Sequence, residues 1–183
     1  PFPYASGQYT LIDPSFASAF DGNLTEWLPS ERLDYGFGTV AGHEVYGKFA
    51  NEEFIFGVRS ALDIGVGTTF WFNTDQNSAS GYQVFGYASG AEYNINIGGD
   101  GIARLYSGGA GETWVGNIDY KIALDGKSIE FALPKSLIGA GVTTVKMMAD
   151  INDSIFLPGD YTFAPYSVTD PSSIPQPAAN GYR

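Results

Sequence analysis

Short segments in which apolar and polar residues alternate run through the middle of the chain. One such segment is AEYNINI, residues 91–97, where Tyr93, Ile95 and Ile97 share one face and polar side chains share the other. A period of two residues is typical of a β-strand with one buried face. Repeated at short, regular spacing, this pattern predicts about nine or ten strands.

Strands and turns account for nearly all of the pattern, and no long helical period interrupts it. The expected β-structure is a hairpin over 43–61 and further strands over 68–74, 81–88, 91–97, 102–106, 117–124, 128–134, 143–153 and 160–167. PKSLIG, residues 134–139, begins with proline and predicts a single helical turn. These elements predict an all-β fold, an antiparallel β-sandwich that is jelly-roll-like.

The chain is long enough for one domain. Its 183 residues can bury a full hydrophobic core and are few for two domains. We predict a single β-sandwich domain over residues 1–169. Residues 170–183 are rich in Pro, Ser and Ala and predict a linker or tail. The chain starts at Pro1 with no signal-like segment, so we interpret it as a mature form or an excised module with flanking domains.

Charge and composition narrow the classes of partner. The net charge is −11, which would repel a phosphate backbone, so we expect no nucleic-acid partner. The same acidity suits bound calcium, whose preferred ligands are oxygens. There is no cysteine, which excludes disulfides and thiolate metal sites. No apolar run reaches the length of about 18 residues that a spanning helix needs, so we expect no membrane insertion.

A polar loop between aromatic strands carries the first candidate site. In FWFNTDQN, residues 70–77, the oxygen-bearing side chains Asn73, Asp75 and Asn77 recur at every second position. In an extended loop they would point the same way, as alternating calcium ligands do, and Glu92 on a neighbouring strand would add a carboxylate. The alternative is a turn whose side chains cap their own backbone. We predict a calcium site formed by these four residues.

A second acidic group lies in the segment ADIND. Asp150, Asn152 and Asp153 end one expected strand, and Asp160 follows a few residues later. These residues could form another metal site, or join Asp21 in the opening turn of the chain. A solvated strand end is the simpler interpretation, because charged residues usually lie at the surface.

Aromatic residues are numerous enough to form a ligand-binding surface in addition to a core. Sugars stack their apolar C–H faces on flat rings, with polar groups around the hydroxyls. Trp114 follows the flexible segment SGGAGE and is the best candidate for an exposed ring, with Tyr87 and Tyr106 as further candidates. Trp71 is expected in the core, and Trp27 is expected to close one end of the sandwich.

Catalysis has little support in the sequence. His43 is the only histidine, and no GxSxG nucleophile motif occurs. We therefore interpret His43 as a surface residue. No pair of acids has the close alternating spacing known from sandwich glycosidases, which need two carboxylates facing across a sugar. We expect the protein not to be an enzyme.

The order of several motifs resembles a known family. DGNLTEW, EEFIFGV, FWFNTDQN followed by GY, GAEYNINI and SIEFALPKSLIG are similar to the family 9 carbohydrate-binding module and its DOMON-like relatives. The resemblance covers roughly residues 20–165. It implies a β-sandwich that binds sugar and often holds structural calcium. Related modules belong to secreted multidomain bacterial proteins, including large adhesins.

These features together predict a non-catalytic carbohydrate-binding module of a secreted or cell-surface bacterial protein. Its ligand would be a polysaccharide or glycan, and calcium would be structural. The alternative is a structural or adhesive spacer domain of a large surface protein, with no sugar site. A polysaccharide hydrolase or lyase is the third alternative.

Overall fold

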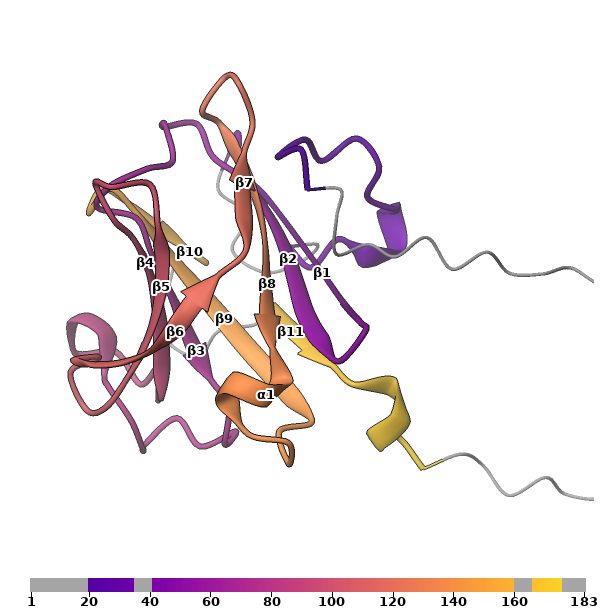
Figure 1. Cartoon of the computed structure of the whole chain (residues 1–183), viewed down its shortest axis with the longest axis vertical. Helices are drawn as coiled ribbons and strands as arrows, with labels where there is room; N and C mark the ends of the chain where they lie inside the picture. Colours follow the sequence, from indigo (N-terminus) through magenta and orange to yellow (C-terminus); the bar gives the residue numbers. More distant parts are fainter. Residues whose placement is uncertain (1–19, 35–40, 160–165, 176–183) are drawn as a thin grey trace, which may run out of the picture.

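The polypeptide folds as two antiparallel β-sheets that pack face to face (Figure 1). This computed structural model describes residues 20–34, 41–159 and 166–175. The described residues form 11 strands, slightly more than expected. The prediction of an all-β antiparallel sandwich is therefore confirmed.

The smaller sheet contains four strands in the order β1–β2–β8–β7. Their bounds are Glu44–Ala50 (β1), Glu53–Arg59 (β2), Ser128–Pro134 (β8) and Tyr120–Ile122 (β7). β1 and β2 form the hairpin expected over residues 43–61. Its turn residues, Asn51 and Glu52, have φ angles of 53° and 61°, which is the conformation of tight two-residue hairpin turns.

The larger sheet contains seven strands. Six follow the order β10–β9–β3–β4–β5–β6, and β11 pairs with β9. Their bounds are Thr69–Asn73 (β3), Tyr93–Ile97 (β4), Ala103–Ser107 (β5), Thr113–Ile118 (β6), Thr144–Ile151 (β9), Ile155–Leu157 (β10) and Tyr166–Thr169 (β11). Because β6 and β10 are the two ends of this order, side chains on them lie at opposite edges of the sheet.

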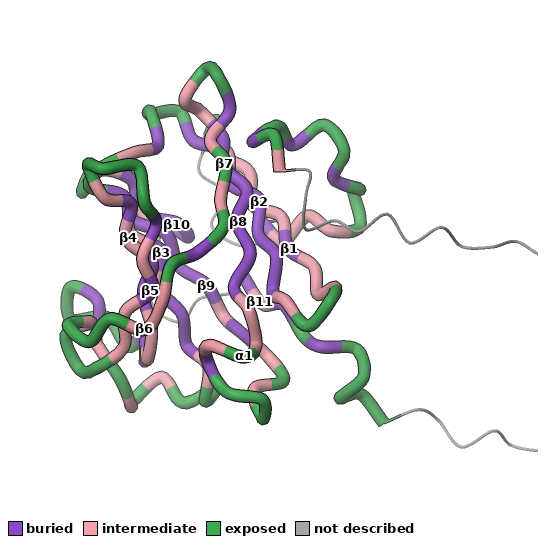
Figure 2. The backbone as a smooth tube through the Cα atoms, viewed as in Figure 1, coloured by how far each residue is buried: buried purple, intermediate pink, exposed green. Residues whose placement is uncertain are grey.

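The hydrophobic core lies between the two sheets (Figure 2). Phe56 of β2 and Phe131 of β8 stack with ring centroids 5.6 Å apart. Phe70 of β3 reaches across from the other sheet, with its ring centroid 4.6 Å from that of Phe131. All three side chains are buried. Full burial of one such side chain contributes about 1.5–3 kcal/mol, so this aromatic cluster stabilises the contact between the sheets.

The strand expected over residues 81–88 is not present, and this prediction is wrong. The segment is a loop with one 3₁₀ turn, η3 (Val84–Gly86), closed by a bridge at Tyr82. Val84 and Tyr82 pack with Met148 on the outer face of the seven-stranded sheet. Its apolar residues are buried because the loop covers a sheet, and a short apolar pattern does not distinguish that case from a strand.

Two other expected strands have different bounds. The strand expected over residues 117–124 is divided at Asp119, where the chain leaves the larger sheet after β6 and enters the smaller sheet as β7. Of the strand expected over 160–167, residues 160–165 lie outside the described residues. β11 begins at Tyr166 and continues the sheet beyond the expected end.

Helical structure within the described residues is limited to short turns. They are η2 (Pro29–Glu31), η3, α1 (Lys135–Ile138) and η4 (Pro171–Ser173). α1 confirms the turn predicted over 134–139, with Pro134 directly before the first helical residue. None of these helices has the length and apolar character that crossing a membrane requires.

The beginning of the predicted tail is in contact with the sandwich. Asp170 is buried, and its carboxylate accepts a hydrogen bond from Lys135 Nζ at 2.6 Å. The turn η4 follows, and residues 176–183 lie outside the described residues. The boundary between domain and tail at residues 169 and 170 stays a prediction.

Candidate functional site

The outer face of the seven-stranded sheet brings together two of the three predicted ligand-binding residues. Tyr106 on β5 and Trp114 on β6 are register partners on adjacent strands. Adjacent strands lie about 4.8 Å apart, so the two side chains start from neighbouring positions on one face. Trp114 is 60% exposed, and Tyr106 is half-buried. We call Tyr106 and Trp114 the aromatic pair.

A β-bulge sets the direction of the Trp114 side chain. Leu105 pairs with Gly116, but Tyr106 pairs with Trp114, so Val115 is an extra residue in β6. Val115 packs against the core between the sheets. The bulge therefore lets β6 turn half-buried Val115 towards the core and expose Trp114 beside Tyr106.

Polar side chains continue the same face next to the aromatic pair. Asn94 of β4 is the register partner of Tyr106, and Asn96 is the partner of Arg104. Asn96 Nδ2 donates to Asn94 Oδ1 at 2.7 Å, and Thr69 Oγ1 donates to Asn96 Oδ1 at 2.7 Å. The face thus combines two aromatic rings with planar amides that are held by their neighbours.

The glycine-rich loop between β5 and β6 borders this face. Gly111 lies against the side chain of Asn94, where an added Cβ would sit 1.8 Å from Asn94 Nδ2. Its φ of +67° also favours glycine. Asn94 is only 2% exposed as a result. The loop SGGAGE is therefore packed on the sheet beside the aromatic pair.

Tyr87 lies elsewhere. It lines a depression of about 320 Å³ together with Phe85, Phe156 and Gly159. Phe156 is on β10, at the opposite edge of the sheet from Trp114. The structure therefore does not bring Tyr87 together with the aromatic pair.

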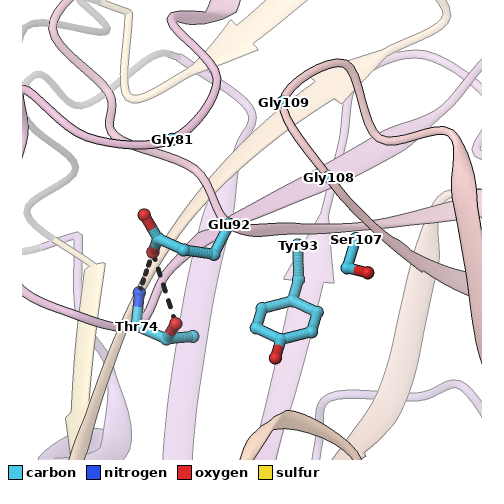
Figure 3. Close-up of a pocket in the computed structure, with 7 residues that line it drawn as sticks. All are labelled: Thr74, Gly81, Glu92, Tyr93, Ser107, Gly108 and Gly109. Carbon is cyan, nitrogen blue, oxygen red and sulfur yellow. Dashed lines mark hydrogen bonds between the residues drawn. The ribbon is translucent and has the colours of Figure 1, made fainter.

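Two of the four predicted calcium ligands converge on one hydroxyl. Ser80 Oγ lies 2.7 Å from Asp75 Oδ2 and 3.4 Å from Glu92 Oε1. Glu92 Oε2 accepts hydrogen bonds from Thr74 N at 2.8 Å and from Thr74 Oγ1 at 3.3 Å (Figure 3). The two carboxylates are thus close to each other through Ser80.

The other two predicted ligands serve the loop itself. Asn73 is fully buried; its Oδ1 accepts from Gln76 N at 2.8 Å, and its Nδ2 donates to the Ser89 carbonyl at 3.2 Å. Asn77 Oδ1 accepts from Ala79 N at 3.1 Å. These are the self-capping contacts of the alternative interpretation. The predicted site therefore contains two converging carboxylates and two amides engaged with the loop backbone.

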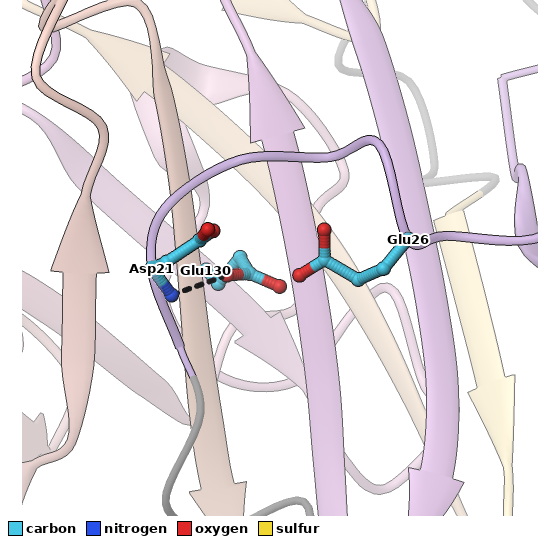
Figure 4. A group of neighbouring side chains, drawn as sticks. All are labelled: Asp21, Glu26 and Glu130. Carbon is cyan, nitrogen blue, oxygen red and sulfur yellow. Dashed lines mark hydrogen bonds between the residues drawn. The ribbon is translucent and has the colours of Figure 1, made fainter.

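A cluster of three carboxylates, which the sequence analysis did not identify, lies on the outer face of the four-stranded sheet. Asp21, Glu26 and Glu130 each place a carboxylate oxygen within 4.8 Å of the others (Figure 4). Glu130 on β8 is buried, and the other two are exposed. Such a group has the chemistry of a metal site, because calcium prefers carboxylate oxygens. We call these three residues the acidic triad.

Hydrogen bonds tie the first described segment of the chain to Glu130. Trp27 Nε1 donates to Glu130 Oε1 at 2.9 Å, and the backbone N–H groups of Asp21 and Gly22 donate to Oε2 at 3.2 and 3.0 Å. Burial raises the pKa of Glu130 above its ordinary value, and the nearby Glu26 carboxylate adds to the rise, while the hydrogen bonds from Trp27 and Gly22 partly oppose it. Trp27 therefore lies over a sheet face, and the expectation that it closes the end of the sandwich is wrong.

Sequence reasoning missed Glu130 because of its position in the alternation. In SIEFALP its neighbours Ile129 and Phe131 point into the core, which predicts a solvent-facing Glu130. The segment DGNLTEW covers that face, and the two segments are far apart in sequence. The signal in the sequence was the combination of Glu130 within the strand SIEFALP and two further acids in the segment DGNLTEW.

The second acidic segment is only partly solvated. Asp150 is buried, whereas Asp153 is exposed. Burial raises the pKa of Asp150 to about 6, and the Asp153 carboxylate raises it as well. Asn152 Oδ1 accepts from Thr68 Oγ1 at 3.1 Å. Asp160 lies outside the described residues. For Asp150, the expectation of a solvated strand end is therefore wrong.

His43 is buried, so the expectation of a surface residue is wrong. Its Nε2 accepts a hydrogen bond from Ala61 N at 3.4 Å, and its Nδ1 lies 3.0 Å from the Ala41 carbonyl oxygen. The ring therefore joins the two segments on either side of the β1–β2 hairpin.

Trp71 is also not in the core between the sheets, where it was expected. Its ring stacks on that of Tyr82 on the outer face of the seven-stranded sheet, with ring centroids 5.0 Å apart.

No family model, curated protein or solved structure matches the chain. The resemblance to family 9 carbohydrate-binding modules stays a prediction. Function is therefore argued from the residues and geometry of this molecule.

Proposed function

We propose that the protein is a non-catalytic carbohydrate-binding module whose stacking surface is the aromatic pair, Tyr106 and Trp114. The observation that supports this proposal is their register pairing on an outer sheet face, with Trp114 60% exposed. Tryptophan buries a large apolar area when a ligand covers it, and the adjacent Tyr106 ring extends that surface. The apolar C–H face of a sugar ring fits such a surface.

Polar groups beside the aromatic pair suit the remainder of a sugar. Half-buried Asn96 lies on the same sheet face, on the strand next to that of Tyr106. Asn94 is covered by the loop at Gly111 and serves only to hold Asn96. Binding sites of this kind combine apolar rings with a few placed polar groups that fix orientation. A glycan is the ligand class that has both an apolar ring face and closely spaced hydroxyls.

The proposal includes calcium in a structural role. Three carboxylates converge in the acidic triad, whereas the predicted loop site has only two, those of Asp75 and Glu92. Calcium takes about 6–8 oxygen ligands, and the triad supplies more carboxylate oxygens than the loop does. A bound cation would offset the repulsion among Asp21, Glu26 and Glu130.

The setting that we propose is a secreted or cell-surface protein in which this module has flanking domains. Its support is the resemblance of the motif order to modules of secreted multidomain proteins. A structural or adhesive spacer with no sugar site is the alternative. The two differ in whether the aromatic pair binds a glycan.

Glycan-array binding followed by calorimetry tests the proposal. We expect the wild type to bind at least one glycan class and Trp114→Ala to weaken that binding by at least about tenfold, because central aromatic contacts dominate binding energy. Trp114→Phe should retain part of the affinity. Tyr87→Ala removes an aromatic residue at the other edge of the sheet and should leave binding unchanged. Absence of glycan binding by the folded wild type would favour the spacer.

A further inference from the structure

A second depression lies at the end of β4 and β5, where the register partners Tyr93 and Ser107 are on the core-facing side of the sheet and the aromatic pair is on the outer face. It has a volume of about 390 Å³ and is lined by Thr74, Gly81, Glu92, Tyr93, Ser107, Gly108 and Gly109 (Figure 3). We call it the Glu92 pocket. Ser107 directly follows Tyr106 on β5, and its register partner Thr113 directly precedes Trp114. The pocket and the aromatic pair therefore lie at the same end of β5, with Ser107 on the core-facing side and Tyr106 on the outer face.

Glu92 has hydrogen-bonding capacity left for a ligand. A carboxylate offers about four lone-pair sites, and Thr74 uses two of them through its N–H and its hydroxyl. The Ser80 hydroxyl has one hydrogen, and it lies closer to Asp75 Oδ2, at 2.7 Å, than to Glu92 Oε1, at 3.4 Å. Glu92 Oε1 is thus available to hydroxyl donors.

The pocket walls have the apolar and open character that a sugar ring needs. Tyr93 contributes an aromatic ring, fixed because its hydroxyl donates to the Ile138 carbonyl at 3.2 Å. Three lining residues are glycines, so the backbone is accessible. A Cβ at Gly109 would meet no atom within 4 Å, which shows that this wall faces open space.

The charge around the pocket is negative. Among its lining residues there is no lysine or arginine. Asp75 shares the Ser80 hydroxyl with Glu92. The Glu112 carboxylate lies against Gly108, where an added Cβ would be 2.8 Å from Oε2. A ligand that carries its own carboxylate or sulfate would be repelled here.

We infer that the Glu92 pocket receives one neutral sugar ring of a glycan that passes around the end of β5 from the aromatic pair, and that the pocket discriminates against acidic sugars. Glu92 Oε1 accepts hydrogen bonds from the ring hydroxyls, and Tyr93 contacts its apolar face. Asp75, Glu92 and Glu112 exclude uronic and sulfated rings. This inference rests on the proposed function, and it adds the ligand class and a specificity-determining residue.

Calorimetry with paired ligands tests the inference. The probes are neutral oligosaccharides from the array and, for each chain, the form with C6 oxidised to a carboxylate. We expect the wild type to prefer the neutral form. Glu92→Gln should weaken binding of the neutral form by about tenfold, because a charged acceptor is lost, and should reduce the discrimination against the acidic form. Asp119→Asn, an exposed acid outside the pocket, makes the same charge change and should alter neither.

A second variant tests the pocket by filling it. Gly109 is not in the left-handed region and has open space at its Cβ position, so Gly109→Phe should fold normally and block the ring. We expect Gly109→Phe to lose binding of the neutral glycan by at least about tenfold, with an unchanged melting temperature. Normal binding by Gly109→Phe, or equal losses for neutral and acidic forms in Glu92→Gln, would overturn the inference.

The two proposals fail differently. If the folded wild type binds no glycan, the proposed function fails, and this inference fails with it. If the wild type binds acidic glycans as well as neutral ones while Trp114→Ala still weakens binding by at least about tenfold, the carbohydrate-binding function stands and the inference about the Glu92 pocket is wrong.

Discussion

Asp150 is a buried acid whose surroundings favour its neutral form. It lies on β9 between register partners Thr69 of β3 and Phe156 of β10, and its Oδ1 has no hydrogen-bond partner among the described residues. Burial raises its pKa from 3.8 to about 6, and the carboxylate of Asp153 adds to the effect. At neutral pH the folded protein therefore holds a carboxylate that would be better solvated in the unfolded chain.

Asp150→Asn should stabilise the protein at neutral pH. The folded pKa is raised, so the favourable contribution of Asp150 is present below its unfolded pKa and is lost as pH rises through about 6. Near pH 3.5 the variant and wild type should unfold alike, and at pH 7 the variant should be more stable by roughly 1–2 kcal/mol. Denaturant unfolding at both pH values measures the difference. The same replacement at the exposed Asp119 should change little. Equal stability at pH 7 would show that the Asp150 carboxylate is adequately solvated.

At the residue scale, the sequence predicts which side a strand residue faces but not what covers it. Alternation correctly placed Ile95 and Ile97 on the buried face of their strand. It also placed Glu130 outward, where a distant segment then buries it. His43 is buried by contacts to residues on both sides of a hairpin. Such burial depends on tertiary contacts that local periodicity does not contain.

The segment from Phe20 to Asp34 acts as a strap across the outer face of the four-stranded sheet (Figure 1). Leu24 and Trp27 pack on that face, where Gly57 leaves room for them: an added Cβ would be 2.8 Å from Leu24 Cδ2. Gly22 fixes the start of the strap, because its φ is +83° and an added Cβ would lie 2.2 Å from Ala123 N. The strap also supplies two of the three carboxylates of the acidic triad.

Gly22→Ala should release the strap. The left-handed backbone conformation of Gly22 disfavours any residue with a Cβ. An added Cβ would also clash with the backbone of Ala123, so the strap would have to move to make room for it. We expect a loss of at least about 2 kcal/mol in the free energy of unfolding, and a red shift in fluorescence as the buried Trp27 becomes solvated. Gly141→Ala is the matched control, because an added Cβ there meets nothing within 4 Å and its φ is not left-handed. An unchanged Trp27 environment in folded Gly22→Ala would mean that the strap is not anchored at Gly22.

At the element scale, strands that pair with neighbours in sequence were predictable, whereas loops that pack on a sheet were not. The β1–β2 hairpin and the strand at 91–97 follow from alternation between turns. Residues 81–88 carry a similar density of apolar residues, but Val84 is buried by lying on the sheet. The division of 117–124 at Asp119 reflects a change of sheet, which leaves no mark on the alternation.

At the scale of the whole molecule, many short amphipathic segments were enough to predict the sandwich architecture. Predicting that Tyr106 and Trp114 are neighbours would also have required the register of the strands. Tyr106 and Trp114 become neighbours through the bulge at Val115, and no spacing rule in the sequence specifies a bulge. Charge is also a property of the whole chain. A net charge of −11 opposes compaction, and the acidic triad concentrates part of that charge at one buried glutamate.

Calcium should therefore stabilise the folded protein, and mutations can distinguish the two candidate calcium sites. A ligand at about 100 times its Kd adds about 2.7 kcal/mol to the stability of the state that binds it. For a chain of this size that corresponds to a rise of about 5–10 °C in melting temperature. Thermal unfolding in calcium and then in EDTA measures the rise, and magnesium, which needs tighter octahedral geometry, should produce less of it.

Glu26→Gln and Asp75→Asn distinguish the two candidate locations for the ion. Glu26 is exposed and belongs to the acidic triad, and Asp75 is exposed and belongs to the loop at 73–78, so each variant removes one surface carboxylate. We expect Glu26→Gln to abolish the response to calcium and to raise stability in EDTA, because it relieves repulsion with the buried Glu130. Asp75→Asn should retain the full response. The opposite pattern would place calcium at the loop, and a wild type whose melting temperature is the same in calcium and EDTA would exclude a structural ion at either location.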